Sequence, residues 1–66
     1  MDQKVVTLTV PADGSFARAV RMTAANLAVL AGMNVDELED VRMAAEEGFV
    51  YACSTQSEDV AIVFTL

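Results

Sequence analysis

The chain has 66 residues, a formal net charge of −6 at pH 7 and 55% apolar residues, with one cysteine and no histidine. This acidic balance excludes a nucleic-acid-binding surface, which needs clustered lysine and arginine to neutralise phosphates. Without histidine a Ser-His-Asp triad is excluded, and with only one cysteine so is a structural zinc site.

A chain of this length forms one small domain over residues 1–66, and such a domain buries only about 60% of the surface that its unfolded chain exposes. No segment reaches the ~20 apolar residues of a membrane span, and the N-terminus lacks the features of a signal peptide, so we expect a cytoplasmic protein without a membrane partner. The apolar content is high for a small solvated domain. We therefore expect a protein partner or a second copy to cover part of the surface.

The first predicted element is a strand over residues 4–10, in which Val6, Leu8 and Val10 alternate with positions that face the other way. Pro11 is expected to end this strand, because proline cannot donate to a ladder of hydrogen bonds. Asp13 can cap a helix that is expected over residues 15–31. Apolar residues and one threonine at three- and four-residue spacing predict its buried stripe: Phe16, Val20, Thr23, Leu27 and Leu30.

Gly32 is placed to end this helix in the left-handed conformation. Asn34 and Glu37 have the spacing of a capping box, so a second helix is expected from Val35 to Cys53. Its buried stripe is predicted at Leu38, Val41, Ala45, Phe49 and Ala52, and an adjoining flank holds Asp40, Ala44, Glu47 and Tyr51. Met22, Met33 and Met43 are expected to fill gaps in the core, and Cys53 to be a small buried residue.

A polar loop is expected over residues 54–59, followed by a second strand over the uncharged, β-prone residues 60–66. The order strand, helix, helix, strand predicts an α+β fold. A helix hairpin returns the chain near its start, so the two strands should pair antiparallel with both helices on one face. An isolated two-stranded sheet is barely stable, and another chain is expected to complete it. Because the chain stops inside its most hydrophobic run, we also expect it to be truncated.

The residues with possible chemistry lie in the second helix. Glu47 is either a general base or metal-site carboxylate, with Tyr51 one turn later, or a solvated glutamate on a helix flank. Glu46 is expected to pair with Arg42, four residues earlier. Gly48 costs up to ~1 kcal/mol relative to alanine inside a helix, which suggests that a neighbouring helix approaches closely there.

Three segments together resemble the N-terminal half of anti-sigma-factor serine kinases, which are GHKL (Bergerat-fold, histidine-kinase-like) ATPases. They are Leu8-Thr-Val-Pro-Ala-Asp13, Ala31-Gly-Met-Asn34 and Glu37-Leu-Glu-Asp-Val-Arg-Met-Ala-Ala-Glu-Glu-Gly-Phe-Val-Tyr-Ala52, with an alanine-rich helix between the first two. The resemblance covers residues 6–66 and implies half of a Bergerat fold. It also implies that Glu47 is the catalytic base, and that an intact relative binds ATP and Mg²⁺.

Tyr51 occupies the position at which the resembled family has its Mg²⁺-binding asparagine. A phenol is a poor Mg²⁺ ligand at neutral pH, so Tyr51 is a doubtful cofactor-binding residue. The nucleotide lid, the adenine-reading aspartate and the glycine-rich loops of that family would all follow residue 66. We therefore expect no bound cofactor or metal in this chain.

The resemblance thus implies a truncated or degenerate relative that is not competent to bind ATP and acts in transcription regulation as a protein-interaction module. Its partner would be a sigma factor or an anti-sigma antagonist, and it would form a dimer or another homo-oligomer. Two alternatives stay open. The chain could be the N-terminal piece of an active ATP-dependent serine kinase, or an unrelated small α+β protein that self-associates.

Overall fold

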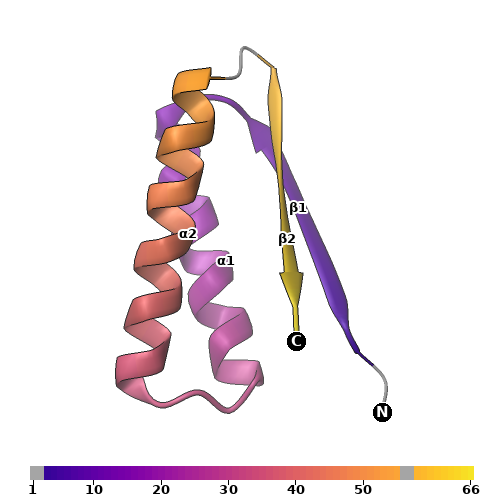
Figure 1. The fold of residues 1–66 in the computed structure, drawn as a ribbon, viewed down its shortest axis with the longest axis vertical. Helices are drawn as coiled ribbons and strands as arrows, with labels where there is room; N and C mark the ends of the chain where they lie inside the picture. Colours follow the sequence, from indigo (N-terminus) through magenta and orange to yellow (C-terminus); the bar gives the residue numbers. More distant parts are fainter. Residues whose placement is uncertain (1–2, 56–57) are drawn as a thin grey trace.

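The computed structural model describes residues 3–55 and 58–66, which form two strands and a helix hairpin (Figure 1). In chain order the elements are β1 (Val5–Pro11), the short 3-10 helix η1 (Gly14–Phe16), α1 (Ala17–Leu30), α2 (Val35–Thr55) and β2 (Asp59–Thr65). The predicted α+β order is confirmed. Of the loop predicted at residues 54–59, residues 56 and 57 lie outside the described part, and Ser54 and Thr55 belong to α2.

The two strands pair antiparallel, as predicted, with a register that runs from Val5 opposite Thr65 to Pro11 opposite Asp59. Lys4 and Leu66 exchange both backbone hydrogen bonds, at 3.3 and 2.8 Å. Bonded and non-bonded pairs alternate in an antiparallel ladder, so Pro11 stands at a position that needs no N–H toward β2. The expectation that the strand ends before Pro11 is therefore wrong by one residue.

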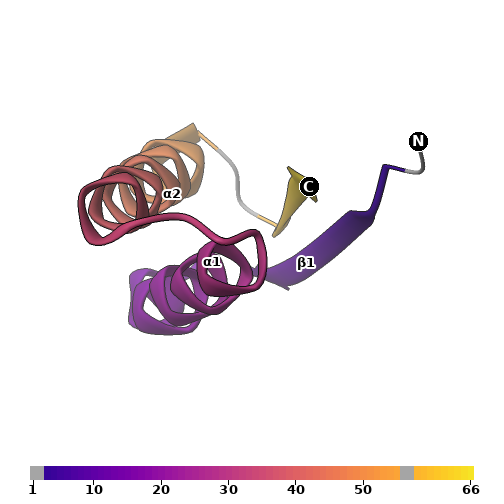
Figure 2. The ribbon, with the colours of Figure 1, turned by 90° about the horizontal axis from the view of Figure 1, so that it is seen from below.

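Both helices lie on the same side of the sheet (Figure 2). The buried core lies between the layers and consists of Val10, Val20, Phe49 and Val60, with Leu8 and Ile62 among the half-buried residues around it. Side chains of β1 alternate as predicted, because Val6, Leu8 and Val10 are covered while Val5, Thr7 and Thr9 are exposed. The outer face of the sheet is thus open among the described residues, and its covering by another chain stays a prediction.

The buried face of α1 differs from the predicted stripe. Its fully buried residues are Val20, Ala24 and Ala28, whereas Phe16 lies at the surface and Leu30 is 78% exposed. Small side chains let helices approach closely, which is consistent with buried alanines in a helix that packs against another helix. The predicted stripe is therefore right only at Val20 and partly right at the half-buried Thr23 and Leu27.

The turn between the helices is built from the predicted caps. Gly32 has a φ of +76°, its N–H donates to the carbonyl of Val29, and the N–H of Met33 donates to the carbonyl of Ala28. These two bonds form a Schellman motif. The capping box also forms, because Asn34 N–H donates to Glu37 Oε1 at 3.0 Å and Glu37 N–H donates to Asn34 Oδ1 at 2.8 Å.

Other sequence expectations about the core need correction. Met22 and Met43 are exposed rather than buried, and only Met33 is half-covered. Cys53 is half-buried and packs against the core. Nothing lies within 4 Å of the place that a Cβ would take at Gly48, so the expected close approach of a neighbouring helix is wrong. Neither α1 nor α2, as described, has an apolar stretch long enough to cross a membrane.

The two helix-associated glycines are expected to respond to alanine with opposite signs. Gly32→Ala should lower the free energy of unfolding by about 1–2 kcal/mol, because its left-handed backbone penalises a Cβ. Gly48→Ala should raise the free energy of unfolding by about 0.5–1 kcal/mol, because the site is open and helical. Urea denaturation of both variants measures this difference. Equal effects of the same sign would contradict the described backbone.

The pKa of the Asp13 carboxyl is lowered from its usual range because Ser15 N–H donates to Asp13 Oδ1, at 2.9 Å. A lowered folded-state pKa stabilises the fold above the ordinary aspartate pKa, and this contribution is lost as pH falls through the folded-state value. The melting temperature of wild type should therefore fall more than that of Asp13→Asn between neutral and acidic pH. Asparagine can still cap and does not titrate, so parallel melting curves would contradict this role.

Candidate functional site

The predicted flank of α2 exists as a solvent-facing strip. Asp40, Ala44, Glu47 and Tyr51 are all exposed. Residues four apart lie one above the other on a helix, so Glu47 and Tyr51 are neighbours on this strip. The predicted shared flank of Glu47 and Tyr51 is therefore confirmed, and their role as site residues stays a prediction.

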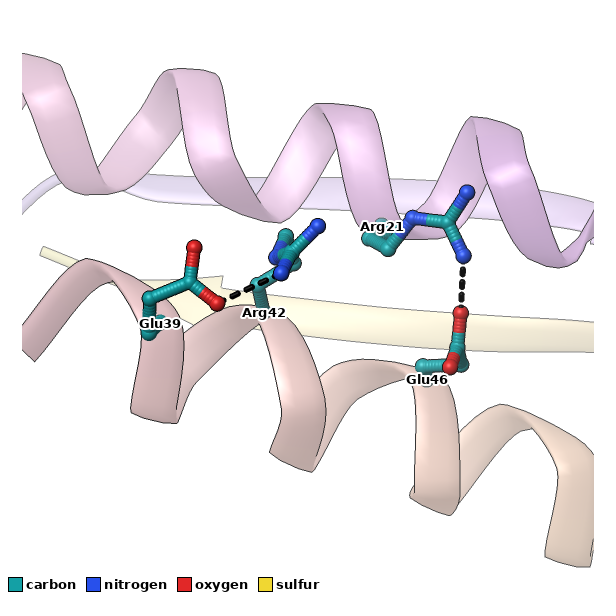
Figure 3. A network of polar contacts seen from close by, with 4 residues as sticks. All are labelled: Arg21, Glu39, Arg42 and Glu46. Atoms are coloured by element: carbon teal, nitrogen blue, oxygen red, sulfur yellow. Dashed lines mark hydrogen bonds and ion pairs between the residues drawn. The ribbon is translucent and has the colours of Figure 1, made fainter.

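Glu46 points away from this strip, about 100° around the helix from Glu47. It forms an ion pair with Arg21 of α1 and so ties the two helices together (Figure 3). The predicted partner Arg42 instead pairs with Glu39, three residues earlier on α2. The Arg42–Glu46 prediction is wrong, because Arg21 from the neighbouring helix occupies the space beside Glu46. Glu46 is therefore a structural residue.

Among the described residues, Glu47 is exposed rather than covered by a second element. In the part of the chain that the structure describes, the side chains of Glu47 and Tyr51 make no hydrogen bond or ion pair, and no pocket opens. Across residues 3–55 and 58–66, no three acidic or thiol side chains lie close enough together to hold a metal ion. A general base needs a substrate held against it, and these residues provide only one wall of such a site.

The resemblance implies ATP and Mg²⁺ for an intact relative, and the residues present do not fit them. The position one turn after Glu47 offers a phenol in place of an amide oxygen, and Tyr51 is 72% exposed. Glu46 could not substitute, because it is already paired with Arg21 on a different side of α2. No reaction step through a nucleotide can be derived from this helix.

Sequence reasoning missed the apolar residues around Glu47. Met43 and Val50 are each 54% exposed and lie four residues before and three residues after Glu47. With Tyr51 they place exposed apolar side chains within about one turn of Glu47. The exposure of Met43 could have been predicted from helical spacing. Met43 lies within about one turn of both Asp40 and Glu47, so it shares their solvated flank. We call Met43, Glu47, Val50 and Tyr51 the α2 patch.

Comparison with known proteins adds no assignment. No protein-family description matches the chain, and no curated protein has a significantly similar sequence.

Proposed function

We propose that this chain is a regulatory protein-interaction module of the anti-sigma-factor serine-kinase type, and that it binds a protein partner through the α2 patch. The observation that carries the proposal is the exposure of Glu47 and Tyr51 beside two exposed apolar side chains, Met43 and Val50. Patches of this kind mark protein interaction sites more often than scattered surface residues do.

The chemistry of the patch selects the kind of partner. An aromatic and two flexible or branched apolar side chains supply contact area, and Tyr and Met are enriched in the centres of interfaces. Glu47, with Asp40 about two turns before it, supplies negative charge. The matching surface is an apolar helix or groove edged by lysine or arginine. A sigma factor or an anti-sigma antagonist is the partner class that the family resemblance suggests.

Catalysis by this chain alone is a weaker proposal, because the described residues surround Glu47 on only one side. Calorimetric titration with ATP and Mg²⁺ is expected to give no heat of binding. Saturable binding at micromolar nucleotide would contradict the proposal and would favour the alternative of a kinase fragment.

The partner is tested with a set of purified sigma factors and anti-sigma antagonists from the organism that encodes the chain. We expect one of them to bind the wild-type chain, and Glu47→Lys and Tyr51→Ala to weaken that binding by about tenfold each, as for central interface residues. Glu58→Lys is the matched control, because it makes the same charge change at an exposed site near β2. If Glu47→Lys and Glu58→Lys weaken partner binding equally, the effect comes from net charge alone. The α2 patch would then be rejected as the binding site.

The folding of each variant is checked first. Replacement of the exposed Glu47 is expected to change the free energy of unfolding by less than about 0.5 kcal/mol. A larger change would show that Glu47 has a structural role instead.

A further inference from the structure

We infer that one amphipathic helix of the partner protein lies on the outer face of the helix hairpin, parallel to α1, with lysine or arginine residues over α2. This binding mode rests on the proposed function, because it names the partner segment that covers the α2 patch. It adds α1 to the binding surface and defines the direction of the bound helix.

The outer face is the side of the helix layer that points away from the strands. Figure 2 shows both helices on one side of the sheet, and no described element lies beyond them. Two ion pairs, Arg21–Glu46 and Glu39–Arg42, lie between α1 and α2, and their side chains are partly exposed (Figure 3). A segment bound along the hairpin would therefore cover two pairs whose charges already balance.

Large apolar side chains of both helices stand on this outer face. Val29 lies about 180° around α1 from the core residue Val20, and Met43 lies about 120° around α2 from the core residue Phe49. Each of the large apolar residues on this face is at least 50% exposed: Met22 and Val29 of α1, and Met43 and Val50 of α2. We call these four residues the outer helix face. Exposed apolar surface contributed by two neighbouring elements marks an interaction site.

The spacing of the outer helix face fits a third helix. Met22 and Val29 are seven residues apart, with Ala25 between them on the same side of α1. Met43 and Val50 are also seven residues apart. Side chains that recur every three or four residues form rows of ridges between which the side chains of another helix insert. An extended strand, whose side chains alternate every second residue, does not match that repeat.

The outer face of the sheet offers less apolar contact area than the helices do. Its exposed large apolar side chains are those of Val5 and Val63. Most of the other exposed residues of β1 and β2 are small or polar, including Thr7, Thr9 and Ala61. The helix layer is therefore the stronger candidate for binding a partner.

Charge selects a basic helix as the occupant. Asp36, Asp40 and Glu47 lie within about 40° of one another on α2, beside Met43, and all three are exposed. The ion pairs found among the described residues include none of them. Lysine or arginine side chains of a bound helix would pair with this acidic row. The net charge of −6 attracts such a segment over a long range.

Arg18 and the acidic row give the bound helix its direction. Arg18 is exposed, lies one turn before Met22 near the start of α1, and makes no ion pair among the described residues. Asp36 and Asp40 lie at the opposite end of the hairpin, after the turn between the helices. The complementary helix has an acid near Arg18 and bases near Asp36 and Asp40. Acids are favoured in the first turn of a helix and bases in the last, so this helix runs parallel to α1.

Binding is tested with a synthetic peptide of about 18 residues, which spans roughly 27 Å as a helix. It has leucine at heptad positions a and d, glutamate in the first turn, lysine in the last two turns and alanine elsewhere. Fluorescence anisotropy of the labelled peptide should show saturable binding with a dissociation constant of about 100 µM or lower. A peptide of the same composition with the charge order reversed should bind at least about threefold more weakly. No saturable binding of the first peptide up to about 1 mM would overturn the inference, and equal binding of the two peptides would overturn the assigned direction.

The surface is tested with Val29→Lys, and Val63→Lys on the outer face of the sheet is the matched control. Val29 and Val63 are 62% and 61% exposed, so both variants add one positive charge at equally exposed valines. Val29→Lys should weaken peptide binding about tenfold, because its ammonium group faces the leucines and lysines of the peptide. Val63→Lys should weaken it no more than about twofold, through net charge alone. Equal weakening by both variants would overturn the inference. Far-UV circular dichroism first checks that both variants fold, and Met22→Lys tests the same face should Val29→Lys not fold.

These results separate the bound helix from the proposed function. Tyr51 lies about 100° around α2 from Val50, on the side away from α1, so Tyr51→Ala should change peptide binding less than about twofold. If a sigma factor or an antagonist binds in a Tyr51-dependent way but Val29→Lys leaves peptide binding unchanged, the proposed function stands and the bound helix is rejected. If Val29→Lys weakens peptide binding and no sigma factor or antagonist binds, the bound helix stands and the proposed partner class is rejected.

Discussion

Phe49→Ala is expected to unfold most of the chain at 25 °C. Phe49 is 1% exposed and is the only α2 residue in the buried core, which it forms together with Val10 of β1, Val20 of α1 and Val60 of β2. Truncation of a buried phenylalanine costs about 3–5 kcal/mol. A 66-residue domain is expected to have a free energy of unfolding of only about 3–10 kcal/mol. The loss is therefore comparable with the whole stability of the fold.

Circular dichroism during urea titration measures this effect, with Val50→Ala as the control. Val50 is the next residue in the chain but lies on the exposed side of α2, so its truncation should cost less than about 0.5 kcal/mol. Phe49→Leu should fall between the two, because it keeps an apolar side chain at the centre of the core. A midpoint that is the same for Phe49→Ala and Val50→Ala would contradict the described packing of α2 on the sheet.

The features that the sequence predicted correctly depend on local geometry. Alternation of β-branched residues identified the inner face of β1, and the hydrogen bonds of Asn34 with Glu37 connect residues three apart. Gly32 adopts the left-handed conformation because glycine has no Cβ, which is a property of the residue itself. The antiparallel pairing also followed from a local feature, since a short turn between two helices brings the chain back beside its first strand.

The failed predictions for the buried face of α1 and for the partner of Glu46 required knowledge of contacts between segments that are distant in the sequence. Apolar residues occur on every side of α1, so spacing alone could not decide which side is buried. The buried side carries Ala24 and Ala28, and the larger Leu30 is exposed. In the same way, Arg21 replaced Arg42 as the partner of Glu46 because another helix brings it there. The spacing of residues within α2 cannot show that an arginine of another helix will pair with Glu46.

The candidate site shows the same division. Periodicity predicted that Glu47 and Tyr51 share an exposed flank, and the structure places them there. Their function depends on what lies opposite them, and no described residue of this chain does so. Of the two interpretations of Glu47, a solvated glutamate on a helix flank agrees with its exposure in this structure. Binding of the proposed partner would change that environment. The α2 patch is therefore where binding should alter the exposure and reactivity of side chains.

The close packing of the helices makes a second strong prediction, at Ala24. Ala24 is fully buried, and it lies one turn after Arg21, which pairs with Glu46 of α2, so we expect it to lie where α1 packs against α2. Leucine at this position adds volume where the small side chain allows the helices to approach. Overpacking of this kind typically costs about 1–3 kcal/mol, because side chains leave their preferred rotamers and the backbone shifts.

Ala24→Leu should therefore lower the urea midpoint, whereas Ala19→Leu should leave the free energy of unfolding within about 0.5 kcal/mol of wild type. Both changes add the same groups to the same helix, and both replace the best helix former with a good one. They differ in burial alone, because Ala19 is exposed. A lower urea midpoint for Ala24→Leu than for Ala19→Leu would therefore measure the cost of overpacking, because both variants make the same change in helix propensity. Coincident midpoints would mean that the helices have room for a larger residue, and the ion pair between Arg21 and Glu46 would then hold a looser hairpin than the one described.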